Sequence, residues 1–207
     1  MPPQKIRAII SDIGRVIVGV DVSRAMQGLS NSIPLSPKEI WSAIEKDPRF
    51  VDLQDGRISA RDWHLHIVRR LGGNLTYDQF IQAWNAALLP ETLQPDSLWA
   101  GLAKKYRLSL LSNTDPIHVA HMESTFTFFK YFPVRIYSCV VGSSKPNPII
   151  YQDALRATKV KANEAVYIDD LEENVAAAKS LGMIGVHCAD PATLRDRLTA
   201  AGVDLGS

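Results

Sequence analysis

The sequence has few cysteines, almost no charge imbalance and no long apolar stretch. Its two cysteines, Cys139 and Cys188, lie inside apolar runs without metal-ligand spacing, so we expect buried, reduced thiols. The net charge of +1 provides no basic field for nucleic acid and no polybasic run for a membrane. Residues 1–5 begin no long hydrophobic region, and no uninterrupted apolar stretch of about 18 residues follows. We therefore expect no nucleic-acid or membrane partner and a cytoplasmic location.

What is present is typical of a globular chain. The 207 residues are 46% hydrophobic and 22% charged, which excludes a disordered or fibrous protein. This length accommodates one good hydrophobic core and a small second one. We expect a single domain with an appendage, and the sequence leaves the oligomeric state open.

Short continuous apolar runs, separated by segments of helical periodicity, indicate the fold class. Continuous runs are typical of strands that are covered on both faces, as in a parallel sheet with helices on either side. We therefore predict an α/β fold with a doubly wound, Rossmann-like parallel sheet. The expected strands are Ile6 to Ile10, Leu108 to Leu111, Ile136 to Val141, Val166 to Ile168 and Ile184 to Cys188.

The segment from about Val20 to Leu89 contains no convincing strand and several helix starts. Ser36-Pro37-Lys38-Glu39 and Thr76-Tyr77-Asp78-Gln79 have the form of capping boxes, and Ser59 begins another helix with Trp63, Ile67 and Leu71 on its apolar side. We predict a small all-helical cap inserted after the first strand. The expected domains are an α/β core of residues 1–19 and 90–207 and a cap of residues 20–89.

Polar residues that follow the expected strands supply the chemistry of phosphoryl transfer. Asp12, Ser112 and the pair Asp169-Asp170 each follow an apolar run, where ligands bind at the carboxyl edge of a parallel sheet. Lys145 is held between rigid prolines and serines. A carboxylate can attack phosphorus, a hydroxyl and an ammonium can hold phosphate oxygens, and adjacent acids favour Mg²⁺. Each fragment alone also fits a turn, a helix cap or a solvated side chain.

Together these fragments resemble the haloacid dehalogenase-like hydrolases, and among them the capped phosphatases typified by bacterial glucose-1-phosphate phosphatase. The matching stretches are Ser11 to Val18, Leu110 to Thr114, Ser144 to Tyr151 and Tyr167 to Ala178. The resemblance implies a Mg²⁺-dependent phosphatase that acts on a small phosphorylated substrate through an aspartyl-phosphate. It implies Asp12 as nucleophile, Ser112 and Asn113 as phosphate holders, Lys145 as charge neutraliser, Asp12, Asp169, Asp170 and the carbonyl of Gly14 as Mg²⁺ ligands, and Asn174 as a supporting residue.

One position departs from the family pattern. Most family phosphatases carry a second Asp two residues after the nucleophile as general acid and base, but this chain has Gly14, followed by Arg15. General acid–base help contributes about 10² to 10⁴ in rate, so its loss predicts a slow enzyme or a good leaving group, such as that of a sugar 1-phosphate. Asp21, Asp115 and His118 are candidates for a general acid that replaces the one missing at Gly14. Arg15 and Arg57 are candidate substrate-binding residues.

Three alternatives remain open at this stage. A 2-haloacid dehalogenase would use the same first carboxylate on carbon, but it needs no metal and leaves Asp169-Asp170 unexplained. A signalling receiver module uses similar residues in the reverse order and has no helical insert. A catalytically weak or silent phosphate-binding protein would agree with Gly14.

Overall fold

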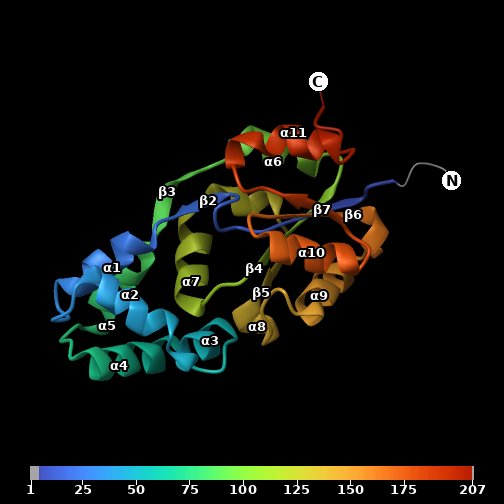
Figure 1. Ribbon diagram of the computed structural model, residues 1–207. Coiled ribbons are helices and arrows are strands. Elements are labelled where there is room, and N and C mark those ends of the chain that lie inside the picture. The colour runs from blue at the N-terminus through green and yellow to red at the C-terminus, as the bar shows by residue number, and fades with distance from the viewer. Residues whose placement is uncertain (1–4, 207) are drawn as a thin grey trace.

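A parallel five-stranded sheet forms the centre of the computed structural model, which describes residues 5–206. The strand order is β5-β4-β1-β6-β7 (Figure 1), and each neighbouring pair is parallel. The predicted fold class is confirmed. The strands are β1 (Ala8–Ser11), β4 (Arg107–Ser112), β5 (Val134–Tyr137), β6 (Ala165–Asp169) and β7 (Ile184–His187).

Alternate side chains of β1, β4 and β6 enter two separate hydrophobic cores. Ile9 packs on one face of the sheet and Ile10 on the other, because successive side chains of a strand point in opposite directions. One core is shared with α6 (Asp96–Ala103) and α11 (Leu194–Ala200), and the other with α9 (Pro148–Thr158) and α10 (Glu172–Ser180). Figure 1 shows these two pairs of helices on opposite sides of the sheet. Burial on both faces explains the continuous apolar runs.

Five helices between β1 and β4 form a third hydrophobic cluster around Trp63, Phe80 and Trp84. We call residues 20–89 the helical segment. The N-cap hydroxyls of Ser36, Ser59 and Thr76 each accept a backbone N–H three residues on, as the sequence predicts. The division of the chain at residues 19 and 90 stays a prediction, and residues 1–4 and 207 of the predicted core lie outside the described residues. The five helices are α1 (Val22–Ser30), α2 (Pro37–Glu45), α3 (Pro48–Gln54), α4 (Ala60–Leu71) and α5 (Tyr77–Asn85).

Helix α7 (Pro116–Thr125) lies between the helical segment and the sheet (Figure 1). Its Ile117 joins the cluster of the helical segment, and its Met122 joins the core that the sheet shares with α6 and α11. Short turns of 3-10 helix complete the chain at η1 (Thr127–Tyr131), η2 (Ala162–Glu164) and η3 (Pro191–Thr193). Within the described residues, no helix combines the length and apolarity needed to cross a membrane.

Two details of the sequence prediction were wrong. The expected strand from Ile136 to Val141 ends at Tyr137, because β4 offers no partner beyond Ser112, and the chain then forms the short helix α8 (Ser138–Val141). The helical segment is also bordered by an antiparallel pair that the sequence missed, β2 (Val18–Val20) and β3 (Leu88–Thr92), since both strands are short and β3 contains Pro90.

Candidate functional site

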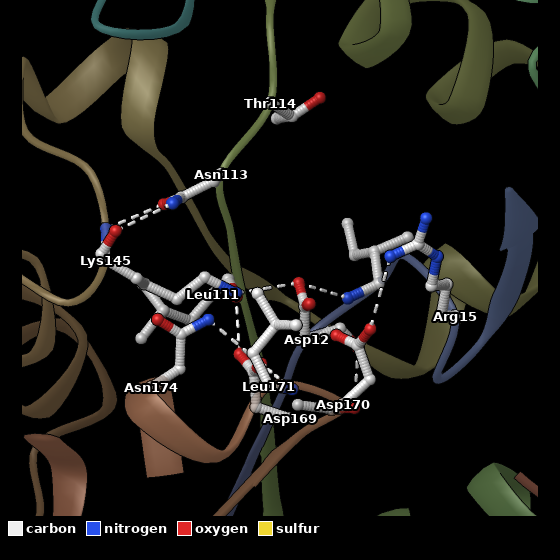
Figure 2. A network of polar contacts seen from close by, with 12 residues as sticks. Asp12, Arg15, Leu111, Asn113, Thr114, Lys145, Asp169, Asp170, Leu171 and Asn174 are labelled. Carbon is white, nitrogen blue, oxygen red and sulfur yellow. Dashed lines mark hydrogen bonds and ion pairs between the residues drawn. The ribbon is translucent and has the colours of Figure 1, made fainter. Parts of the chain in front are cut away.

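The carboxyl ends of β1, β4 and β6 bring the candidate residues together (Figure 2). Asp12 directly follows β1, Ser112 and Asp169 end β4 and β6, and Asp170 comes next. The strands are adjacent and parallel, so their ends meet at one edge of the sheet. The structure therefore gathers the residues that the sequence placed after separate apolar runs.

Three carboxylates form the acidic part of this edge. Asp12, Asp169 and Asp170 each offer one oxygen, and these oxygens lie within 4.8 Å of one another. Asp12 and Asp169 are buried, whereas Asp170 is half-buried. A compact set of carboxylate oxygens has the donor chemistry of a Mg²⁺ site, so these residues fit the ion that the sequence predicted. The predicted participation of the Gly14 carbonyl stays a prediction.

Lys145 lies between two of these acids. Its buried Nζ is 2.9 Å from Asp12 Oδ1 and 2.8 Å from Asp169 Oδ2, and it donates to the carbonyl of Leu111 at 3.2 Å. The side chain of Asn113 holds the backbone of Lys145: its Nδ2 donates to the Lys145 carbonyl at 2.9 Å, and its Oδ1 accepts the Lys145 N–H at 2.7 Å. Figure 2 shows this paired contact. Asn113 therefore positions the lysine, and its predicted contact with phosphate stays a prediction.

Asp169 is fixed by donors on both oxygens. Its Oδ1 accepts Asn174 Nδ2 at 3.0 Å and the backbone N–H of Leu171 at 2.9 Å. Its Oδ2 accepts the ammonium of Lys145 and the hydroxyl of Tyr167. These contacts hold the carboxylate in one orientation, and the supporting role expected of Asn174 stays a prediction. Tyr167 was missed, although residues two apart on a strand share a face and Tyr167-x-Asp169 has that spacing.

The ionisation of the cluster reflects its burial. Burial raises the pKa of Asp12 to about 6, against the lowering effect of Lys145, and the nearby Asp169 raises it further. Burial also raises the pKa of Asp170. For Lys145, burial lowers the pKa, but the Asp12 and Asp169 carboxylates outweigh it and the net shift is upward. The Lys145 ammonium and the Arg15 guanidinium, 3.8 Å from Asp170, face three acids, which leaves negative charge for a divalent cation to neutralise.

The two candidate arginines lie in different surroundings. Arg15 has a left-handed backbone, with φ of 57°, and its Nη1 is 3.8 Å from Asp170 Oδ2 (Figure 2). Arg57 contacts Asp52 at 3.0 Å and Asp55 at 2.7 Å within the helical segment. Arg15 therefore borders the acidic cluster, whereas Arg57 is paired with its own loop. Substrate binding by either residue stays a prediction.

The three candidate substitute acids are all engaged in hydrogen bonds. Asp21 caps α1 and accepts the Ser23 N–H at 3.0 Å. Asp115 Oδ2 accepts His118 Nδ1 at 2.9 Å and Trp84 Nε1 at 3.1 Å, while its Oδ1 accepts two backbone N–H groups of α7. Burial raises the pKa of Asp115, but His118 outweighs this and the net shift is downward. Asp115 is therefore ionised near neutral pH and has no proton to give.

Comparison with known proteins supports the assignment made from the motifs. The D-ribitol-5-phosphate phosphatase of Bacteroides thetaiotaomicron is 28% identical over 203 residues, or 94% of this chain and 97% of the relative. The sesquiterpene phosphatase of Aspergillus oryzae is 38% identical over 195 residues, or 89% of this chain and 90% of the relative. A crystal structure of a haloacid dehalogenase-family enzyme from Bacteroides thetaiotaomicron, in complex with magnesium and inorganic phosphate, has a TM-score of 0.77 at 25% identity, covering 88% and 93% of the two chains.

Two solved dehalogenases have similar folds. The 2-haloacid dehalogenase of Pseudomonas syringae has a TM-score of 0.63 at 17% identity, covering 94% of this chain and 99% of that one. At such identity the likeness concerns the fold alone. The model of the haloacid dehalogenase-like hydrolases, by contrast, matches residues 23–182 of the sequence itself. The chain therefore belongs to the haloacid dehalogenase-like hydrolase family.

Proposed function

We propose that the protein is a Mg²⁺-dependent phosphomonoesterase that cleaves a small phosphorylated metabolite through an aspartyl-phosphate on Asp12. The observation that carries this proposal is the position of Lys145 Nζ, 2.9 Å from Asp12 and 2.8 Å from Asp169, beside a cluster of three acids. The two relatives that this chain matches over most of their length, both phosphatases, agree with the proposal. The cytoplasmic location expected from the sequence stays a prediction.

In this proposal each residue has a separate task. The Lys145 ammonium and the Ser112 hydroxyl bind phosphate oxygens and orient the phosphorus toward Asp12. One carboxylate oxygen of Asp12 then forms a bond to phosphorus while the ester P–O bond breaks, and its electron pair leaves with the alcohol oxygen. A Mg²⁺ ion held by Asp12, Asp169 and Asp170 would reduce the repulsion between phosphate and carboxylate.

The second half of the reaction returns the enzyme to its starting state. Water attacks phosphorus, the Asp12–phosphorus bond breaks, and inorganic phosphate is released from the free carboxylate. Position 14 is a glycine, Asp115 is an ionised hydrogen-bond acceptor, and both ring nitrogens of His118 are paired, so in this proposal water protonates the departing alcohol oxygen. This arrangement favours substrates with good leaving groups, of which a sugar 1-phosphate is one and an aryl phosphate is another.

The alternatives differ from this proposal in their need for metal and in turnover. A 2-haloacid dehalogenase gains nothing from three acids within 4.8 Å, and a silent phosphate-binding protein hydrolyses no ester. The test is phosphate release from sugar, polyol, alkyl and aryl phosphates with Mg²⁺, repeated with a chelator and with Asp12→Asn. The control is Asp196→Asn, an exposed position on α11. We expect release that requires Mg²⁺ and Asp12; undiminished release by Asp12→Asn would overturn the mechanism.

A further inference from the structure

A cavity of about 150 Å³ adjoins the acidic site between the helical segment and the core. Gly14, Ser112 and Asn113 form its wall on the side of the phosphate-binding residues. A group joined to a phosphate held by Ser112 would therefore extend into this space. Most of the remaining wall is apolar, and its largest side chains are those of Met26, Trp41, Phe50 and Trp84.

Three aromatic side chains fix the shape of the apolar wall. The ring of Phe50 meets Trp41 edge to face at 6.2 Å between centroids, and it meets Trp84 in the same manner at 6.1 Å. Trp84 is almost fully buried, and its Nε1 donates to Asp115 at 3.1 Å. The polar atom of this indole is already paired, so the ring offers its carbon surface to the cavity. Rings that support one another in this way give a preformed apolar site.

The charged residues of the wall have no capacity left for a ligand. Both oxygens of Asp115 accept two donors each. His118 Nδ1 contacts Asp115 at 2.9 Å, and its Nε2 contacts the carbonyl of Trp84 at 3.2 Å. Among the residues that the structure describes, the wall beyond Ser112 and Asn113 then leaves the hydroxyl of Thr114, the amide of Gln54 and the indole N–H of Trp41 to bind a polar ligand.

These three groups are too few for the hydroxyls of a sugar or a polyol. Each hydroxyl that enters the cavity loses its hydrogen bonds to water, and each unreplaced bond weakens binding roughly tenfold or more. An apolar group loses no such bonds and gains from leaving water. The cavity volume of about 150 Å³ matches that of cavities that bind a benzene ring, so the space fits about six carbon atoms.

We infer that the natural substrate is the phosphate monoester of an apolar alcohol that leaves readily, such as a phenol, with about six carbon atoms next to the phosphate held in this cavity. This inference rests on the proposed function, and it replaces the sugar phosphate expected from the sequence. Trp41, Phe50, Trp84 and Met26 select the apolar group. The phosphate is bound by Ser112 and Lys145.

The test is a series of linear alkylphosphonates, from methyl to octyl, bound to the Mg²⁺-loaded protein and measured by calorimetry. Each added methylene that enters the cavity strengthens binding about fourfold, and the gain stops near six carbons when the cavity is full. Ribitol 5-phosphate and glucose 6-phosphate serve as polar comparisons. Affinity independent of chain length, or tighter binding of the polar esters than of hexylphosphonate, would overturn the inference.

Calorimetry separates this inference from the proposed function because it needs no turnover. Chain-length dependence without hydrolysis of any ester would overturn the phosphatase proposal and retain an apolar anion site. Hydrolysis of a phosphate ester, with phosphonate affinities that do not depend on chain length, would overturn the apolar substrate class and leave the phosphatase proposal intact.

A matched pair of variants locates the apolar contact. Met26 is buried in the wall on α1, and Gln has nearly the same shape as Met but a polar end. We expect Met26→Gln to lose most of the gain from methyl- to hexylphosphonate, and Met26→Leu, which stays apolar, to lose far less of it. Equal gains in the two variants would contradict the assignment. If Met26→Gln does not fold, Trp41→Phe replaces it, and a smaller chain-length gain than in the unmodified protein is expected.

Discussion

Lys145 provides the sharpest test of the electrostatics of the site. Its ammonium is buried between Asp12 Oδ1 at 2.9 Å and Asp169 Oδ2 at 2.8 Å. Lys145→Met preserves most of the volume but leaves two carboxylates buried without their cation. Removing one partner of a buried ion pair costs about 3–5 kcal/mol, so we expect the free energy of unfolding to fall by that amount in a chelator near neutral pH.

The assay is urea unfolding followed by circular dichroism, with a chelator and then with saturating Mg²⁺. A cation that binds only the folded state stabilises it, so Mg²⁺ is expected to restore part of the loss in Lys145→Met. The control is Lys105→Met. Its ammonium is 2.6 Å from Asp204, but the side chain is 38% exposed, so we expect a loss below about 1 kcal/mol.

Two results would refute this reasoning. If Lys145→Met lost no more stability than Lys105→Met in the chelator, the buried pair would not stabilise the folded state. If Mg²⁺ stabilised the unmodified protein but left Lys145→Met unchanged, the three acids would not form the cation site once the lysine is gone.

Three further predictions concern pH, packing and the missing acid. Burial lowers the pKa of His118, but Asp115 outweighs burial and raises this pKa above 6.5. The stability from this pair is therefore present below about pH 6.5 and is lost as pH rises through the pKa of the folded state. In urea titrations, His118→Gln should flatten this decrease in the free energy of unfolding. Gly56→Ala should lose far more stability in urea unfolding than Gly142→Ala. Both glycines have positive φ, but only at Gly56 would a Cβ lie 2.0 Å from a backbone oxygen. Gly142→Ala should therefore cost only about 1 kcal/mol, and equal losses in the two variants would refute the clash. Gly14→Asp should raise kcat for an alkyl phosphate by up to about 10², because its Cβ has room and its carboxyl can protonate the leaving oxygen; an unchanged kcat would refute this.

The sequence predicts the sheet and the polar residues at its carboxyl edge, because both can be read from short stretches of neighbouring residues. Asp12, Ser112 and Asp169 follow apolar runs, and burial on both faces makes those runs continuous. A parallel sheet places the carboxyl ends of neighbouring strands at the same edge, so no further signal is needed to bring these residues together. The three helix starts of the helical segment were equally readable, because each depends on a hydroxyl and the backbone N–H three residues on.

Contacts between distant residues left no such signal. Asn113 holds the backbone of Lys145 across 32 positions, and Ser144 donates to Asp55 at 2.5 Å across 89 positions. Neither residue differs locally from an ordinary loop residue. The end of β5 at Tyr137 depends on where β4 stops, which the apolar run beyond Tyr137 conceals. The cavity wall likewise combines α1, α2, α3 and α5 with α7, so its apolar character appears only after the helices pack.

We expect the phosphoryl group to pass through the carboxylate of Asp12, and acid quenching during steady-state turnover tests this expectation most directly. Quenched protein is digested, and the peptides are weighed by mass spectrometry. We predict one additional phosphoryl group on the peptide that contains Asp12 in the unmodified protein, and none in Asp12→Asn. A phosphoryl group on another residue, or release of phosphate with no labelled peptide at any time, would contradict the claim.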